Sequence, residues 1–147
     1  MAHSTFKATS RLKEGLQVDT QVRNFSIHMD EPASLGGTDS GMNPVEALLA
    51  ALGSCLVIVA AAFAKEKDID LQDFWVELEG DLDPAGFLQG KPGVRNGFSE
   101  VRFTPHIKTD ASKEKVDDFI WFVKSRCPVS DVMMNRTQVI AETPIID

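Results

Sequence analysis

The sequence lacks the motifs that mark nucleotide, hydrolase and metal sites. It contains no G-x-S-x-G, no phosphate-binding loop and no G-x-G-x-x-G, so serine hydrolase, nucleotide-binding and Rossmann functions have no motif in their favour. Its three histidines (His3, His28 and His106) are scattered, and with only two cysteines they do not form a metal-ligand spacing. We therefore expect no metal site and no bound cofactor.

Positive charge is also scarce. The 147 residues include 15 Lys and Arg against 22 Asp and Glu, a net charge of −7, which argues against a nucleic-acid partner because phosphate binding needs a basic face. The N-terminus lacks the apolar core of a signal peptide. The longest uncharged run, residues 47–64, falls just short of the roughly 20 residues of a membrane span. These features predict a cytoplasmic protein with no membrane partner, whose cysteines are free thiols or a transient redox pair.

The length suits one domain, residues 1–147. Alternating apolar residues predict strands over 4–10, 15–22, 24–30, 74–83, 99–109 and 137–142, the first two joined by a Lys-Glu-Gly turn. Arg23 then lies in the middle of a strand. Two main helices are expected, from Pro44 to about Lys67 and after Ser112, with a short one from Pro128 to about Met134. Neighbouring strands with inserted helices indicate an α+β fold with an antiparallel sheet.

The first helix has strong start signals and an unusual composition. Asn43 is a good N-cap, Pro44 suits the first position, and Glu46 sits where a capping-box side chain reaches back. Capping alone would explain Glu46, and a catalytic role would be additional to capping and not in competition with it. The helix is apolar nearly all round, so it should be buried on most sides. A second copy of the chain would help to cover it, which favours a homodimer.

The two cysteines stand in different surroundings. Cys55 lies inside the apolar helix, where a thiol most often fills space. Cys127 precedes a proline at a helix start, an N-cap position where the helix dipole and free N–H groups favour a thiolate, with Arg126 adding positive charge nearby. A weak helix cap is the alternative role for Cys127. If the two thiols meet, one can attack an oxidant and the other can resolve the sulfenic acid as a disulfide, but their separation in sequence leaves that open.

Two segments together resemble the OsmC/Ohr family of osmotically inducible and organic hydroperoxide resistance proteins. They are "GGTDSGMNPVEALLAALGSC" and "CPVSDVMMNRTQV", and the similarity extends over about residues 25–139. The details resemble a divergent OsmC-like branch. The resemblance implies an intertwined homodimer with the OsmC-like fold. It also implies a thiol-dependent peroxidase that reduces organic hydroperoxides, with Cys55 as the attacking and Cys127 as the resolving residue. An OsmC-like binding or redox-sensing protein without turnover is the alternative.

The remaining site residues follow from the same resemblance. The family glutamate directly follows Asn-Pro; here that position is Val45, and Glu46 comes one residue later. Arg23 is the best match to the family arginine, with Arg11 and Arg95 as the other candidates. The resemblance implies an external dithiol reductant, similar to dihydrolipoamide. The expected apolar lining for a bulky peroxide consists of Leu52, Leu56 and Phe63.

Overall fold

The computed structural model describes residues 3–146 and divides into two compact units, one up to Ala50 and one from Ala51 onward. Each unit is described by itself below. Helix α1 (Pro44–Phe63) begins in the first unit and ends in the second. As expected from the sequence, the elements are a mixture of helices and antiparallel strands.

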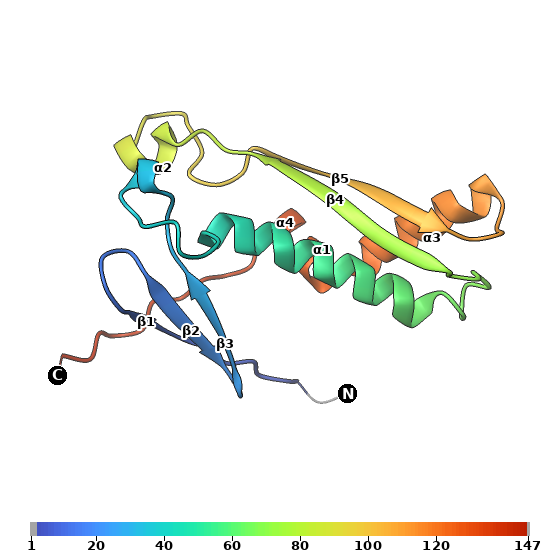
Figure 1. Cartoon of the computed structure of the whole chain (residues 1–147), viewed down its shortest axis with the longest axis horizontal. Helices are drawn as coiled ribbons and strands as arrows, with labels where there is room; N and C mark the ends of the chain where they lie inside the picture. Colours follow the sequence, from blue (N-terminus) through green and yellow to red (C-terminus); the bar gives the residue numbers. More distant parts are fainter. Residues whose placement is uncertain (1–2, 147) are drawn as a thin grey trace. The chain divides into compact units, whose positions relative to one another are not determined.

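The first unit contains a three-stranded antiparallel meander (Figure 1). Its strands are β1 (Thr9–Leu12), β2 (Val18–Val22) and β3 (Phe25–Met29). The predicted Lys-Glu-Gly turn is confirmed: Lys13 N–H donates to the Gln17 carbonyl oxygen at 2.9 Å, and Gly15 adopts a φ of 56°. A left-handed residue suits a tight hairpin connection, which is why glycine stands there.

The placement of Arg23 in the middle of a strand is wrong. Arg23 lies in the turn between β2 and β3, with a φ of 55°. A two-residue connection whose twist matches the strands needs positive φ, and here it takes a non-glycine residue. The Arg23 carbonyl oxygen accepts a hydrogen bond from Gln21 Nε2 at 2.7 Å, and its guanidinium lies 5.0 Å from the centre of the Phe25 ring.

The loop after β3 is organised by one buried carboxylate. Asp30 is 1% exposed. Its Oδ2 accepts hydrogen bonds from the backbone and hydroxyl groups of Thr38 and Ser40 at 2.6 to 3.1 Å, and its Oδ1 accepts one from Glu31 N–H at 2.8 Å. These donors, the Thr38 hydroxyl foremost, hold the pKa of Asp30 well below its usual range. The short 3-10 helix η1 (Ala33–Leu35) lies inside this loop.

Helix α1 begins as the sequence predicts. Asn43 N–H donates to Glu46 Oε2 at 2.8 Å, and Glu46 N–H donates to Asn43 Oδ1 at 2.9 Å, which completes a capping box. The helix ends at Phe63, four residues before the predicted Lys67. A turn follows in which Ile69 N–H donates to the Ala64 carbonyl oxygen at 2.8 Å and Asp68 has a φ of 51°.

One chain does not bury α1 on most sides. Among the described residues, only one face of the helix is buried, formed by Leu52, Gly53, Leu56, Val59 and Ala60, while Ile58 is 66% exposed. The 20-residue helix is long and apolar enough to cross a bilayer by length and composition. This corrects the expectation that the apolar run is too short for a membrane span. The core helix of a soluble protein meets the same criterion.

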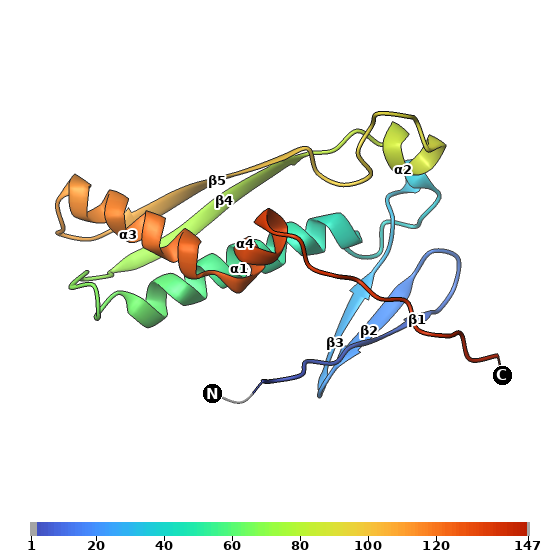
Figure 2. The same ribbon diagram turned by 180° about the vertical axis from the view of Figure 1, so that it is seen from behind.

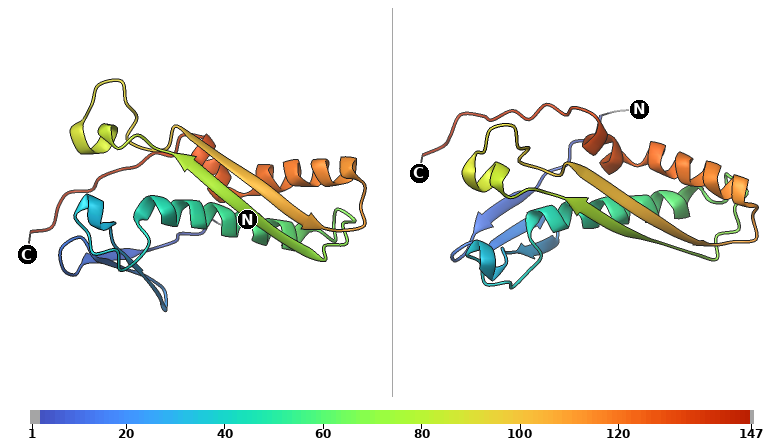
Figure 3. Two further views of the ribbon diagram at one scale, coloured as in Figure 1. Left: turned by 45° about the horizontal axis from the view of Figure 1, so that its top comes forward. Right: turned by 90° about the horizontal axis from the view of Figure 1, so that it is seen from above.

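The second unit packs a two-stranded ladder on helices (Figures 1 and 2). Strands β4 (Asp73–Asp81) and β5 (Glu100–Lys108) pair along their whole length, and Figure 3 shows them lying across α1 and α3 (Lys113–Arg126). The inner face of the ladder presents Leu78, Val101, Phe103 and Ile107 to the core. The helices contribute Leu52, Leu56, Val59, Ala60, Phe119 and Val123.

The rest of the second unit contains a short helix and corrects one expectation. Helix α2 (Ala85–Gln89) lies in the connection between β4 and β5. The strand expected at 137–142 does not form within the described residues. The chain after α4 (Pro128–Met134) is extended and unpaired (Figure 2), with Val139 93% and Ile140 66% exposed. The alternating pattern is present, but a strand also needs a partner, and residues 3–146 supply none there. The described strands therefore form two sheets rather than one.

Candidate functional site

The two cysteine sulfurs meet in the second unit. Cys55 lies in α1 and Cys127 lies between α3 and α4, 72 residues apart in sequence. Their Sγ atoms are 2.7 Å apart, with the Cys127 thiol donating toward Cys55, and both are free thiols. An S–S bond measures about 2.05 Å. The backbone therefore already brings the pair within reach of a disulfide.

Local sequence explains why Cys127 turns inward. Ser112 caps α3 by accepting a hydrogen bond from Lys115 N–H at 3.3 Å, and α3 packs through Phe119 and Val123 into the core with α1. The residue before a proline avoids helical conformation, and Cys127 is extended, with φ −74° and ψ 114°. The chain therefore breaks at Cys127 and restarts as α4, which leaves this side chain buried at the junction.

Burial governs the chemistry of Cys127. The residue is 1% exposed, and its Sγ accepts a hydrogen bond from Ser130 N–H at 3.3 Å, as the predicted N-cap should. Burial raises the pKa of the Cys127 thiol, and the hydrogen bond with Cys55 raises it further; the Ser130 N–H acts in the opposite direction but does not outweigh them. The expectation that its cap position makes Cys127 a thiolate is therefore wrong. Cys55, by contrast, is partly exposed.

The three residues expected to line a peroxide site lie close to the core. Leu52 is 6% and Leu56 1% exposed, and both belong to the same cluster as Cys127. Phe63 is half-buried and meets the Phe122 ring edge-on, with the ring centres 5.4 Å apart. Their contact with a substrate stays a prediction.

The charged candidates have other partners. Glu46 is held in the capping box of α1, and Arg23 lies on Phe25; both belong to the first unit. Arg11 stands opposite Asp19 in the β1–β2 register. The guanidinium of Arg126 lies 5.5 Å from the centre of the Phe122 ring. A role for any of these residues, or for Arg95, at the thiols stays a prediction. Within residues 3–146 no group of His, Cys, Asp and Glu is arranged to hold a metal ion.

Two supporting residues were not identified from the sequence. Ser130 provides the backbone donor to Cys127 Sγ, and the rule that an N-cap accepts from the third helical residue would have found it. Gly53 lies two residues before Cys55, where an added Cβ would stand 2.8 Å from Leu78 Cδ1. The absence of a side chain there lets α1 approach β4 closely, and the sequence alone carries no signal for that contact.

Comparisons of the sequence and of the structure with known proteins point to the same family. The sequence profile described as OsmC-like protein matches residues 37–142. A hydroperoxide reductase from Mycoplasma genitalium is 27% identical over 87% of this chain and 86% of its own. The crystal structure of an OsmC like protein from Mycoplasma pneumoniae superposes with a TM-score of 0.79 at 23% identity, covering 90% of this chain and 89% of the other. An organic hydroperoxide resistance protein OsmC from Legionella pneumophila superposes with a TM-score of 0.69 at 21% identity, covering 90% and 91%. The profile match includes both cysteines and most of the chain, and the chain belongs to the OsmC-like protein family.

Proposed function

We propose that this protein is a thiol-dependent peroxidase that reduces organic hydroperoxides. The observation that carries the proposal is the cysteine pair: a partly exposed thiol lies 2.7 Å from a buried one. An oxidant reaches the exposed sulfur first, and the buried sulfur stands where a resolving thiol is needed. The names of two relatives, a hydroperoxide reductase and an organic hydroperoxide resistance protein, support the substrate class.

The reaction has three steps. The Cys55 thiolate attacks the terminal oxygen of ROOH, the O–O bond breaks, and the alkoxide leaves as the alcohol ROH once protonated, with Cys55 becoming a sulfenic acid. The Cys127 sulfur then attacks the Cys55 sulfur, a disulfide forms and water leaves. An external dithiol, similar to dihydrolipoamide, reduces the disulfide to two thiols and becomes a cyclic disulfide itself. No bound cofactor is needed in this sequence of steps, and a reducing cytoplasm would supply the dithiol.

The hydrogen bond between the cysteines supports Cys55 as the attacking residue. Cys127 donates to Cys55 Sγ, so Cys55 is the sulfur that accepts in this contact. The raised pKa of Cys127 keeps that proton in place at neutral pH. We assign Arg23 as the cation that stabilises the Cys55 thiolate and Glu46 as the residue that orients Arg23. A partner chain supplies both residues.

The proposed partner is a second copy of the chain. Ala51, Ile58 and Ala61 form an exposed apolar stripe on α1 at helical spacing, and exposed apolar surface of this kind favours association. The unpaired segment 137–142 offers a strand to another sheet. Both features fit an intertwined homodimer that completes the two small sheets.

Single-cysteine variants test the assignment. With cumene hydroperoxide and a dithiol reductant, we expect Cys55→Ser to abolish peroxide consumption. Cys127→Ser should still permit one fast oxidation per chain, because the attacking thiol is intact, but no turnover through a disulfide. Mass spectrometry of the oxidised wild-type protein should show the loss of about two hydrogens, the signature of a disulfide. If Cys127→Ser were inert and Cys55→Ser reacted, the two roles would be reversed.

A redox-sensing or binding protein without turnover is the second candidate. Val45 stands where the family resemblance places a glutamate, and Glu46 is engaged in its capping box. Counting free thiols before and after one equivalent of cumene hydroperoxide separates the possibilities when followed by a turnover assay. A sensor loses two thiols but consumes no further peroxide with dithiols, and a binding protein keeps both thiols.

A further inference from the structure

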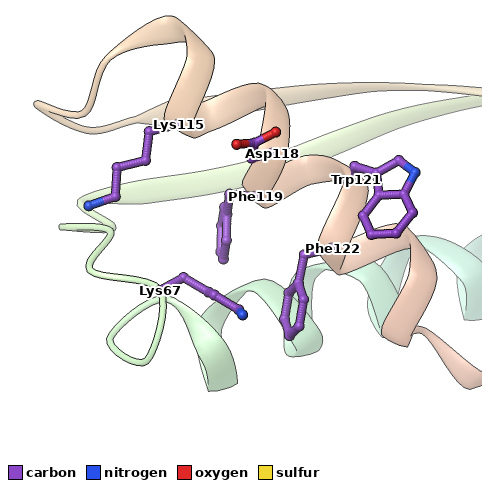
Figure 4. A pocket seen from close by; sticks show the side chains of 6 residues that line it. All are labelled: Lys67, Lys115, Asp118, Phe119, Trp121 and Phe122. Atoms are coloured by element: carbon purple, nitrogen blue, oxygen red, sulfur yellow. The ribbon is translucent and has the colours of Figure 1, made fainter.

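A cavity lies between the turn after α1 and helix α3. It has a volume of about 450 Å³, within the range of roughly 300 to 1,000 Å³ typical of small-molecule sites. Figure 4 shows the side chains around it, with Lys67 on the turn and the others on α3. Its lining consists of Lys67, Lys115, Asp118, Phe119, Trp121 and Phe122.

The cavity gathers positive charge in an acidic chain. The lining carries two lysines and one carboxylate, whereas the whole chain has a net charge of −7. A third cation, Arg126, lies over the same Phe122 ring as Lys67. Within residues 3–146, none of these three cations forms an ion pair with a carboxylate. A group of cations without carboxylate partners indicates attraction for an anion.

The hydrogen-bond donors of the two lysines are only partly used. Lys115 Nζ donates to the Asp68 carbonyl oxygen at 2.7 Å, and an ammonium has further N–H groups to offer. The Lys67 ammonium lies 4.2 Å from the centre of the Phe122 ring, held by the ring face and not by an oxygen. An incoming anion would therefore find donors that need not break an ion pair first.

Aromatic rings form the apolar wall. Phe119 is 2% exposed and anchors the cavity floor in the core, while Trp121 is 72% exposed. An exposed indole beside a half-buried ring is a surface that a flat apolar group can cover. We propose that this cavity binds a small aromatic carboxylate, with its ring on Trp121 and Phe122 and its carboxylate at the Lys67 ammonium, while Lys115 adds longer-range attraction.

Binding is tested on the reduced full-length protein by NMR titration with 2-naphthoate, and with the uncharged 2-naphthamide as the matched probe. We expect saturable movement of the Trp121 indole N–H signal, with that of Trp75 unchanged. The naphthamide should bind at least about tenfold more weakly, because charge-assisted hydrogen bonds are lost. Equal binding of the two probes, or no saturable movement with naphthoate, would overturn the proposal.

Variants separate the site from general charge effects. Lys67→Met with Lys115→Met should weaken naphthoate binding by about tenfold or more, and Asp118→Asn should strengthen it by removing the one repelling carboxylate. Lys113→Met is the matched control, since Lys113 lies on the same helix but pairs with Asp117 outside the lining. If the control weakened binding as much as the double variant, the site would be refuted. Circular dichroism checks folding, and Cys55→Ser should bind normally, which keeps the result independent of the peroxidase proposal.

Discussion

Cys55 and Cys127 come within 2.7 Å of each other at Sγ although 72 residues separate them, and one is partly exposed while the other is buried. The asymmetry arises from secondary structure. Cys55 is one position on a helix with an uncovered face, whereas Cys127 occupies the break between α3 and α4 and turns into the core. Two identical thiols thereby acquire different access to solvent, which suits an attacking and a resolving cysteine.

The raised pKa of Cys127 predicts a pH dependence of stability. A group whose pKa is raised by folding contributes stability that is fully present below its unfolded value, about 8.5 for a thiol, and that is lost as pH rises through the folded value. Under reducing conditions, the free energy of unfolding should therefore fall above about pH 8.5. For Cys127→Ser, the free energy of unfolding from denaturation curves should fall less steeply with pH. The difference in slope should correspond to the uptake or release of at most about one proton. Identical slopes would mean that the thiol is not perturbed.

Asp30 should control the acid end of the stability curve. Its pKa is lowered by folding, so its contribution is present above the unfolded value of about 3.9 and is lost as pH falls through the folded value. In Asp30→Asn, an amide N–H₂ group faces donors from Thr38 and Ser40, so we expect a Tm several degrees lower at pH 7. The loss should shrink as pH falls below about 3.9, because the carboxyl group of the unfolded chain then takes up a proton while the folded one stays ionised to lower pH. A Tm loss that stayed constant across this pH range would contradict the prediction.

Gly37 should tolerate no side chain. An added Cβ would lie 1.8 Å from the carbonyl oxygen of Glu31, and backbone cannot move aside as a flexible side chain can. Gly37→Ala should therefore destabilise the Asp30 loop by about 2 kcal/mol or more. Gly97→Ala is the matched control, because its nearest neighbour is the Arg95 side chain at 3.9 Å. Urea denaturation of the two variants measures the difference, and similar midpoints would show that the loop rearranges at no cost.

Much of the fold was predictable because local rules decided it. The Asn43–Glu46 capping box, the Cys127-Pro128 restart and strand β5 follow from side-chain chemistry within a few residues. The errors occur where the structure of a segment depends on another segment that pairs with it or covers it. The segment 137–142 alternates as a strand but pairs with nothing among the described residues, and α1 is apolar all round but covered on one face. The meeting of the two cysteines depends on how α3 packs against α1, which no local pattern encodes.

A charge on the exposed stripe of α1 should dissociate the proposed homodimer. Ile58 is 66% exposed at the centre of this stripe, and burying a lysine there in an interface would cost several kcal/mol without a partner for its charge. Light scattering of Ile58→Lys should give the mass of one chain, whereas wild-type protein and Ile58→Val should give twice that mass. A wild-type protein that remained monomeric at micromolar concentration would refute the dimer.

The last prediction concerns which chain supplies Glu46. Glu46 and Cys55 are nine residues apart, which in one helix means about 13 to 14 Å along the axis and nearly opposite faces. A glutamate side chain does not span that distance, so if Glu46 acts on a thiol, that thiol is the Cys55 of a partner chain. The alternative is that Glu46 only caps α1, where its loss costs about 1 kcal/mol of stability.

Mixing two inactive variants distinguishes these roles. In a heterodimer of Glu46→Ala and Cys55→Ser chains, a site shared between chains leaves one intact site and one with both defects. The purified heterodimer should then recover about half of the wild-type peroxidase activity, because one of its two sites works. If each site lay within one chain, both sites would stay defective and no activity would return. Full activity in the Glu46→Ala homodimer, with only a lowered Tm, would leave the capping box as the sole role of Glu46.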